Sequence, residues 1–592
     1  MTVGSRQSSG VSPGVISRAV ISRAVISRAV ISLVFAAAAS LEFGSAPAAQ
    51  RGATRFDVLI RNGRIVDGTG APWYRGDVGI TGDRIAALGR LEGEPAGLTI
   101  DASNLVVAPG FIDLLGQSEF TVLVDGRAAS KILQGVTTEV TGEGSSIAPV
   151  NDRLIQEAAA NATHFGVAQD WRTLGDYFRR LEERSRTSIN VATFVGAGGL
   201  RSYVIGKDDR PATPAELEQM KSLAAQAMED GALGVSTSLQ YVPDRFASTA
   251  EIVELAKVAA QYGGVYFTHQ RSEGARIFDS LDEVFTIAER AKIPAEIWHL
   301  KTAYKPQFGK MPEVLRRIEA ARARGLDVTA NQYPYTRASN GLDSCIPLWA
   351  REGGFNKLVE RLNDPATRER IKKDMDDPNA TTWENQWYGA NGGDGVMIST
   401  VLNPSLRKYE GMTLTEIGKA MGKDPRDAVI DLVVADKGET SVITSIMDED
   451  DVRTALKHPL VGVGTDSGAK AADGKLSESK SHPRAWGSFP RILGHYVRDE
   501  RLLPLEEAIR KMTSKAATRV HLADRGVLRP GMAADITVFD AATIRDVSTF
   551  DDPNRYSAGV RHVFVNGRRV VADGSITAER PGKPLRGPGY RK

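Results

Sequence analysis

The chain has 592 residues, more than one compact core usually holds, so about two or three structural units are expected. Its 75 basic and 73 acidic residues give a net charge of +2, a balance that argues against nucleic acid as a partner. Cys345 is the only cysteine, which excludes an intrachain disulfide and a zinc or iron–sulfur site built from cysteines.

Residues 1–55 are expected to lie outside the fold. The pentapeptide Ile-Ser-Arg-Ala-Val repeats over Ile16–Val30, an apolar run continues to Ser40, and Ala46-Pro47-Ala48 follows. This order is typical of a secretory signal peptide, and an amphipathic or disordered extension of a cytoplasmic protein is the alternative. The apolar run is shorter than the ~20 residues of a membrane span. The sequence therefore predicts a periplasmic or secreted, soluble mature chain without stable membrane insertion.

Short apolar segments separated by Gly and Asp fill residues 56–107 and recur in residues 526–592. Examples are Asp57–Arg61, Gly63–Gly68, Gly76–Ile80 and Asp83–Leu88 near the start, and Ala534–Asp540 and Val560–Gly567 near the end. Short segments of alternating apolar and polar residues, separated by Gly and Asp, predict strands and turns. We expect the two terminal parts to pair into one small β-sandwich.

Strand-like and helical segments alternate between residues 108 and 525. The strand candidates are Ala192–Gly196, Leu233–Thr237, Gly264–His269, Glu296–His299 and Leu326–Asn331, and the helix candidates include Pro214–Glu229, Thr249–Gln261 and Met311–Arg324. This α/β alternation predicts a parallel (β/α)₈ barrel with its active site at the carboxyl ends of the strands. Residues from about 348 to 436 break the rhythm and are interpreted as an insertion placed to cover the pocket.

Polar residues close several of the apolar runs. The segments are Thr268-His269-Gln270, Trp298-His299-Leu300-Lys301, Asn331-Gln332-Tyr333-Pro334-Tyr335 and Gly464-Thr465-Asp466-Ser467. His269 and His299 are 30 residues apart, the length of one strand–helix unit, so a barrel would direct both into one pocket. Imidazole nitrogen and carboxylate oxygen suit Zn²⁺, and a catalytic zinc keeps about three protein ligands and an open position. The pattern therefore favours a metal-dependent hydrolase.

Longer stretches of the chain follow one another in a family-specific order. They are Ala108–Asp113, Gln134–Thr138, Gly231–Thr237, His269, His299–Lys301, Tyr333–Thr336, Thr465-Asp466, His482–Arg484, Ser488–Arg491 and Gly531–Asp535. In these stretches, from about Phe56 to Leu585, the chain resembles the amidohydrolase superfamily and, within it, the N-acyl-D-amino-acid deacylase (D-aminoacylase) family. The resemblance implies a metal-bearing (β/α)₈ barrel beside a β-sandwich and the hydrolysis of an amide.

Several positions depart from the pattern of that family. The family carries a His-x-His pair at the end of the first barrel strand, where this chain has Leu115 and Gln117. Leucine cannot coordinate zinc, and an amide oxygen is a poor substitute for imidazole. Glu143 stands where the family places a metal-binding cysteine, and Ala197 replaces a histidine of the substrate pocket. The departures therefore predict one zinc ion per chain.

The resemblance and the ligand chemistry together assign roles to eight residues. We expect His269, His299 and Glu143 to hold the metal, and Asp466 to act as general base and acid. Lys301 and Arg484 are expected to meet the carboxylate of the substrate. Tyr333 and Tyr335 are expected to donate hydrogen bonds to the oxyanion or to line the pocket. The alternatives are structural: hydrogen-bonded histidines, a solvated acidic loop, a helix cap at Thr465-Asp466, ion pairs and barrel packing.

The sequence thus predicts an exported, zinc-dependent amidohydrolase of a small-molecule amide, first of all an N-acyl-D-amino acid. One alternative is a related amidohydrolase that cleaves cyclic amides, dipeptides or hydrophobic amides with a changed pocket. The other is a catalytically inactive homologue that binds a ligand or partner, because half of the binuclear ligand set of the family is replaced. Metal content separates the inactive homologue from the enzymes.

Overall fold

The computed structural model describes residues 56–591 except 381 and 479. The predicted signal peptide lies in residues 1–55, outside the described residues. All of the described residues belong to one structural unit. Both predicted components, a parallel barrel and a sheet built from the two ends of the chain, are found in this unit.

Parallel strands close into the predicted barrel. One sheet has the order β17 (Val461–Val463), β13 (Val328–Gln332), β12 (Ala295–Ile297), β11 (Val265–His269), β10 (Gly234–Ser238), β9 (Val195–Gly196), and a second has β6 (Phe111–Asp113), β7 (Val136–Thr141), β8 (Asn190–Thr193). Backbone hydrogen bonds from Leu114 N to Val463 O and from Leu233 N to Thr193 O join the two sheets. With β8 and β9 as one interrupted strand, the (β/α)₈ barrel is confirmed.

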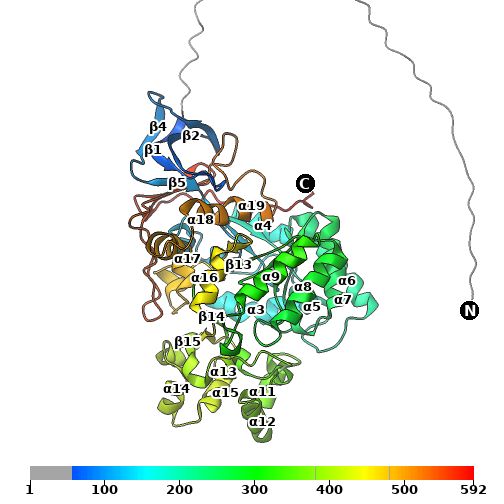
Figure 1. Ribbon diagram of the computed structural model, residues 1–592. Helices are drawn as coiled ribbons and strands as arrows, with labels where there is room; N and C mark the ends of the chain where they lie inside the picture. The colour runs from blue at the N-terminus through cyan, green and yellow to red at the C-terminus, as the bar shows by residue number, and fades with distance from the viewer. Residues whose placement is uncertain (1–55, 381, 479, 592) are drawn as a thin grey trace, which may run out of the picture. The chain divides into compact units, whose positions relative to one another are not determined.

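Helices cover the outside of the barrel, and several of those that connect consecutive strands pack against one another there (Figure 1). These are α6 (Pro214–Asp230), α7 (Thr249–Gln261), α8 (Ile277–Ala291) and α9 (Met311–Ala323). Side chains of Thr213 and Ser248 cap the first turns of α6 and α7, and Gly231 ends α6 at φ 114°. Because these cap and glycine signals are local, the three predicted helix ranges agree with α6, α7 and α9 to within one residue.

The remaining helices connect the barrel strands or follow the last of them. They are α1 (Thr121–Val124), α2 (Ala129–Ile132), α3 (Asp152–Phe165), α4 (Leu174–Glu183), α5 (Ala197–Val204), α16 (Glu449–Lys457), α17 (Arg484–Arg491), α18 (Leu505–Met512) and α19 (Ser514–Arg519). A π-helix, Ile492–Asp499, continues α17 directly. None of the helices in the described part of the chain is long and apolar enough to cross a membrane.

The two ends of the chain share one sheet, as the sequence predicts. Its strands are β1 (Phe56–Ile65), β2 (Tyr74–Thr81), β3 (Arg84–Gly89), β4 (Ala96–Asp101), β5 (Val106–Pro109), β18 (Ile536–Phe539), β19 (Val560–Val565), β20 (Arg568–Ala572) and β21 (Ser575–Ile576). The antiparallel pair of β5 with β18 joins the two ends. Apolar side chains of both ends, such as Ile60 and Ile536, then fill one common core.

The segment between β13 and α16 leaves the barrel, but its limits differ from the prediction. The strands β14 (Arg337–Gly341), β15 (Val396–Thr400) and β16 (Ser441–Ser445) form a separate antiparallel sheet. Its helices are α10 (Leu348–Arg351), α11 (Phe355–Asn363), α12 (Pro365–Met375), α13 (Gln386–Gly389), α14 (Leu414–Met421) and α15 (Pro425–Ala435). The insertion thus spans residues 337–445 instead of about 348–436. The sequence of β14, Arg-Ala-Ser-Asn-Gly, lacks the apolar alternation that would have revealed a strand.

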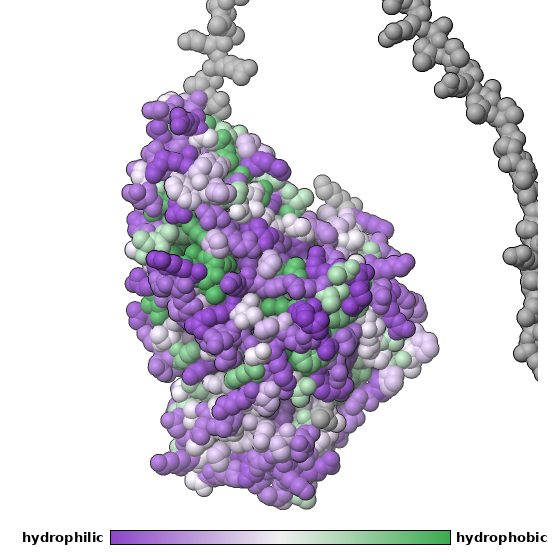
Figure 2. Space-filling view, in the orientation of Figure 1, coloured by the Kyte–Doolittle hydropathy of each residue, from purple (hydrophilic) through white to green (hydrophobic). Residues whose placement is uncertain are grey.

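The face of the molecule in Figure 2 is mostly hydrophilic, with hydrophobic residues in separate patches. In the part of the chain that the structure describes, the exposed large hydrophobic side chains are Trp73, Tyr74, Tyr388 and Tyr590. Single exposed apolar side chains are ordinary on a protein surface.

Candidate active site

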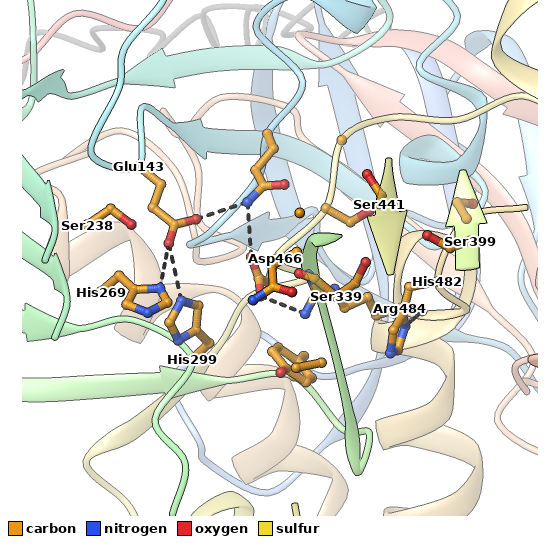
Figure 3. Close-up of a pocket in the computed structure, with 18 of the residues that line it drawn as sticks. Glu143, Ser238, His269, His299, Ser339, Ser399, Ser441, Asp466, His482 and Arg484 are labelled. Atoms are coloured by element: carbon orange, nitrogen blue, oxygen red, sulfur yellow. Dashed lines mark hydrogen bonds and ion pairs between the residues drawn. The ribbon is translucent and has the colours of Figure 1, made fainter. Parts of the chain in front are cut away.

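Residues at the carboxyl ends of the barrel strands surround a cavity of about 530 Å³. Glu143 follows β7, His269 ends β11, His299 follows β12, Tyr333 follows β13 and Asp466 follows β17. Figure 3 shows the labelled acids and histidines of this group turned toward one another. Of the residues predicted for the site, the cavity is lined by Glu143, His269, His299, Lys301, Tyr333, Asp466 and Arg484.

Glu143, His269 and His299 bring three possible metal ligands together. Oε1 of Glu143 lies 3.1 Å from Nδ1 of His269 and 3.2 Å from Nε2 of His299. One ligand atom from each of the three residues lies within 4.8 Å of the other two. Two imidazole nitrogens and one carboxylate oxygen form a donor set that suits zinc and leaves room for one further ligand. The chemistry of these residues therefore fits a single metal ion.

The outer ring nitrogens of both histidines have partners of their own. Nε2 of His269 lies 2.9 Å from Oε1 of Gln240, and Nδ1 of His299 lies 3.0 Å from Oε1 of Glu273. Such contacts fix the orientation of a ligating imidazole ring and tune its basicity. Gln240 and Glu273 were not predicted as site residues. Glu273 follows His269 by four residues in the same strand-end loop, and this short spacing was the available signal.

The electrostatic environment of the three residues favours positive charge. Burial would raise the pKa of Glu143, but hydrogen bonds and charge from the two histidines hold it well below its usual range. Burial and the charge of Lys301 would lower the pKa of His299, but the surrounding carboxylates raise it to about 9. A site that stabilises cationic groups despite burial is also favourable to a metal cation.

Gln117 joins the two carboxylates of the site. Its side-chain amide donates to Oε2 of Glu143 at 2.9 Å and to Oδ1 of Asp466 at 3.0 Å. Leu115 is fully buried in an apolar cluster and does not line the cavity. At the two positions where the family carries histidines, Gln117 thus supplies a hydrogen-bond donor to the site and Leu115 packs in the apolar core.

Asp466 forms an ion pair with Arg484 and does not cap a helix. Oδ2 of Asp466 lies 2.6 Å from Nη1 of Arg484. No described helix begins at this residue, which removes the helix-cap alternative. Burial raises the pKa of Asp466, and the charge of Arg484 opposes this rise. A raised pKa is suitable for a carboxylate that both accepts and returns a proton.

A buried ion cluster holds the loop that carries Asp466. Nζ of Lys131 donates to Oδ2 of Asp113 and to Oγ1 of Thr465, both at 2.7 Å, and lies 3.4 Å from Oε1 of Glu139. The three charged side chains are 0% exposed. Burial raises the pKa of Glu139 to about 7, although the charge of Lys131 opposes this. The cluster ties β6 and β7 to the residue that precedes Asp466.

Lys301 and Arg484 reach the cavity, but each already has a carboxylate partner. Nζ of Lys301 lies 2.5 Å from Oε1 of Glu273, just as Arg484 pairs with Asp466. The two cations lie 5.7 and 4.7 Å from the ring centre of Tyr333. The Tyr333 hydroxyl is buried without a hydrogen-bond partner among residues 56–591 as described. The Tyr333 hydroxyl is therefore available to donate a hydrogen bond to a molecule in the cavity.

Tyr335 does not line the cavity, which corrects its assignment to the substrate site. Its ring contacts His482, with 5.5 Å between ring centres, and the guanidinium of Arg491 lies 5.0 Å from it. Its hydroxyl donates a long, 3.5 Å hydrogen bond to the carbonyl oxygen of Pro483. β13 ends at Gln332 and the chain bends at Pro334, so the two tyrosines enter different surroundings.

The insertion supplies the other wall of the cavity. Its lining residues are mostly small and polar, including Ser339, Asn340, Gln386, Ser399 and Ser441. Three of these serines are labelled in Figure 3, across the cavity from the histidines. The insertion thus lies over the strand ends, as the sequence predicts, and it lines the cavity with uncharged hydrogen-bonding groups.

A second group of possible metal ligands lies outside this cavity. Glu449, His495 and Glu500 also place one ligand atom each within 4.8 Å of the others. Arg453 lies 2.9 Å from Glu500 and 3.6 Å from Glu449, and therefore neutralises these acids. We interpret this group as an ion-pair network.

Comparison with known proteins connects the site to a class of enzymes. The model of a protein family described as "Amidohydrolase family" matches residues 419–571 of the chain. The chain is 36% identical over 531 residues to D-aminoacylase of Alcaligenes xylosoxydans xylosoxydans, covering 90% of this chain and 97% of that protein. Nearly the full length of that relative is therefore represented here.

Two solved structures are similar in both fold and sequence. One is the N-acyl-D-glutamate deacylase of Bordetella bronchiseptica complexed with zinc and a phosphonate that mimics the tetrahedral intermediate, with a TM-score of 0.75 and 33% identity. The other is a D-aminoacylase with a binuclear metal centre, described as activated by one metal and attenuated by the second. Its TM-score is 0.74 and its sequence identity 35%. Each comparison covers 90% of this chain and 100% of the solved chain.

Proposed function

This chain is a metal-dependent amidohydrolase of the D-aminoacylase family, and we propose that it hydrolyses the amide bond of N-acyl-D-amino acids. The grouping of two histidines, Glu143 and Asp466 around one cavity supports this proposal most directly. The substrate activities named for its relatives agree with it. The products would be a carboxylate and a free amino acid.

We propose zinc as the metal, with one ion per chain held by Glu143, His269 and His299. The zinc in the related N-acyl-D-glutamate deacylase supports the choice of element. Gln117 between the two carboxylates and Leu115 in the apolar core support a single ion, because neither side chain is a good zinc ligand. When bound, the ion polarises the amide carbonyl and makes a water molecule a better nucleophile at neutral pH.

Asp466 is the proposed general base and acid. Its carboxylate takes a proton from the attacking water and returns it to the nitrogen of the leaving amine. Gln117 and Arg484 hold its two oxygens, at 3.0 and 2.6 Å, so the carboxylate keeps one orientation during both transfers. The raised pKa of Asp466 makes the return of the proton easier.

Tyr333, Lys301 and Arg484 are the proposed substrate-binding residues. The unpartnered hydroxyl of Tyr333 is placed to donate to the carbonyl oxygen as negative charge develops on it. Lys301 and Arg484 each take part in an ion pair within the protein, with Glu273 and Asp466 respectively, and these acids partly offset their charge. We propose that they bind the α-carboxylate through their remaining N–H groups.

We also propose that the protein is exported. The repeat, the apolar run and Ala46-Pro47-Ala48 support cleavage near Ala49 to Arg51. Amino-terminal sequencing of the protein from the periplasm or medium is expected to begin in that range. Recovery of intact chains beginning at Met1 only in the cytoplasm would contradict export.

A hydrolysis screen with zinc present tests the proposed reaction. The substrates are N-acetyl-D-amino acids, the matching L-enantiomers, dipeptides and cyclic amides, and release of free amine is measured. We expect clear turnover of the N-acetyl-D series, which is lost in the His299→Ala variant. Turnover of cyclic amides or dipeptides alone would instead favour one of the other hydrolase functions, and no turnover with zinc bound would favour the inactive homologue.

A further inference from the structure

Lys470 lines the active-site cavity from the loop that follows β17. The backbone of this residue is held in place, because its N–H donates to Oγ of Ser130 and its carbonyl accepts from the Ser130 N–H, both at 2.9 Å. The two hydrogen bonds attach the loop to α2. The side chain of Lys470 is thus carried into the cavity by a fixed backbone, and it remains partly exposed there.

The ammonium of Lys470 has no protein partner. No residue in the described part of the chain forms a hydrogen bond or ion pair with it, whereas the other two cations of the cavity are paired, Lys301 with Glu273 and Arg484 with Asp466. Burial lowers the pKa of Lys470, and no charged neighbour contributes to the change. The third carboxylate of the cavity, Glu143, is engaged by the two histidines.

A partly buried cation without a counter-charge costs free energy, because it gives up hydration and gains no partner. Structural lysines avoid this cost either by reaching bulk water or by pairing with an acid. Lys470 is only partly exposed and has no acid partner. Of the other cavity groups on its loop, Asp466 is already paired with Arg484, and Ser467 and Ser481 are neutral hydroxyls. A compensating negative charge at this point must therefore come from the bound molecule.

We propose that Lys470 binds a second anionic group of the substrate, so that the enzyme prefers N-acyl amino acids with a carboxylate besides the α-carboxylate. This inference rests on the proposed function and adds a substrate class to it. The second carboxylate belongs either to the amino-acid side chain or to the far end of the acyl group. Both sources present the same chemistry to the ammonium, a charge-assisted hydrogen bond.

Pairs of substrates that differ only in this charge test the inference. N-acetyl-D-glutamate against N-acetyl-D-glutamine examines the side chain, and N-succinyl-D-alanine against N-succinamoyl-D-alanine examines the acyl end. In each pair the preference is the ratio of kcat/KM for the charged over the neutral substrate. We expect one pair to show a ratio of about ten to a hundred in the wild type, the scale of one hydrogen bond to a charged group. The pair that shows it identifies the source.

Variants at two lysines of the same loop connect the preference to this residue. Lys470→Met should reduce the ratio to near one, mainly by raising KM for the charged substrate, and Lys470→Arg should retain most of it. Lys475→Met is the matched control, because it removes the same charge from a side chain that is 52% exposed and pairs with Glu478. The control should keep the wild-type ratio.

Two results would overturn the inference while leaving the proposed function intact. One is hydrolysis of both members of each pair with equal kcat/KM by the wild type. The other is a preference that Lys470→Met leaves unchanged. If the protein hydrolyses none of these compounds, calorimetric titration of the zinc-loaded protein with N-acetyl-D-glutamate and N-acetyl-D-glutamine decides the question, since tighter binding of the charged compound must disappear in Lys470→Met. Equal binding of both compounds by the wild type would refute the role of Lys470.

Discussion

Replacement of Gln117 by methionine tests how the site works without histidines at the end of its first strand. Methionine keeps the length of the side chain but removes the amide that donates to Glu143 and Asp466 at 2.9 and 3.0 Å. A hydrogen bond to a charged group contributes about 1.5–3 kcal/mol. Loss of the bond to Asp466 alone therefore corresponds to a decrease in kcat of about ten- to a hundredfold.

The pH profile distinguishes this positioning role from simple structural damage. Burial already raises the pKa of Asp466, and removal of a donor to its carboxylate raises the pKa further. Since the unprotonated carboxylate is the base, the acidic limb of kcat/KM should move to higher pH in Gln117→Met. A variant that is only less well folded would lose activity at every pH without moving this limb.

The assay is the pH dependence of kcat and kcat/KM on the best N-acetyl-D-amino acid, with zinc content measured in the same samples. Gln261→Met, at the exposed end of α7, is the matched control and should behave as the wild type. Zinc content should stay near the wild-type level in Gln117→Met, because Gln117 touches only one of the three proposed ligands. A wild-type kcat together with an unshifted acidic limb would refute the role given to this amide.

Further substitutions test the other parts of the site. Asp466→Asn should keep its metal and its melting temperature while kcat falls by ~10²-fold or more, and full turnover would exclude it as the proton carrier. His299→Ala should lose metal and activity together, so activity without metal would contradict the assigned ligand set. Lys131→Met should destabilise the fold by about 3–5 kcal/mol in urea unfolding, because it leaves Asp113 and Glu139 buried without a counter-charge. The pKa of Glu139 is raised to about 7 in the folded wild type although the charge of Lys131 opposes this, so removal of Lys131 raises it further. Glu139 is protonated in both folded proteins below this pH and ionises first in the wild type above it, so the cost of Lys131→Met should grow as pH rises above about 7, and a pH-independent cost would contradict this. Gln117→His places an imidazole between Glu143 and Asp466 and should bind a second metal ion by elemental analysis, and an unchanged metal content would show that this position does not control the number of ions.

Much of the architecture could be predicted because its signals are local. The two histidines, one strand–helix unit apart, and the apolar runs before them located β11 and β12 without any knowledge of the rest of the barrel. The caps at Thr213 and Ser248 set where helices begin. The sharing of one sheet by the two ends was predictable because both showed the same strand-and-turn pattern, whereas the particular pairing of β5 with β18 was not.

The contacts that complete the site could not be predicted, because they join residues far apart in the chain. Gln117 and Asp466 are 349 positions apart, and only the closed barrel makes their 3.0 Å hydrogen bond visible. The same holds for Lys131, which reaches Thr465 across 334 positions. Tyr335 was assigned together with Tyr333 because both belong to the family-like stretch Tyr333–Thr336, but the strand ends at Gln332 and the bend at Pro334 separates the two side chains. Lys470 gave no signal at all, since a lysine in a loop is ordinarily a solvated side chain.

Titration of the metal-free protein with zinc tests the central claim most directly. Hydrolysis of an N-acetyl-D-amino acid is measured at each ratio of zinc to protein. The account predicts that activity rises in proportion to added zinc and reaches its maximum at about one ion per chain, with His269, His299 and Glu143 as the protein ligand set. Activity that needs two ions per chain, or activity that does not depend on metal, would contradict it.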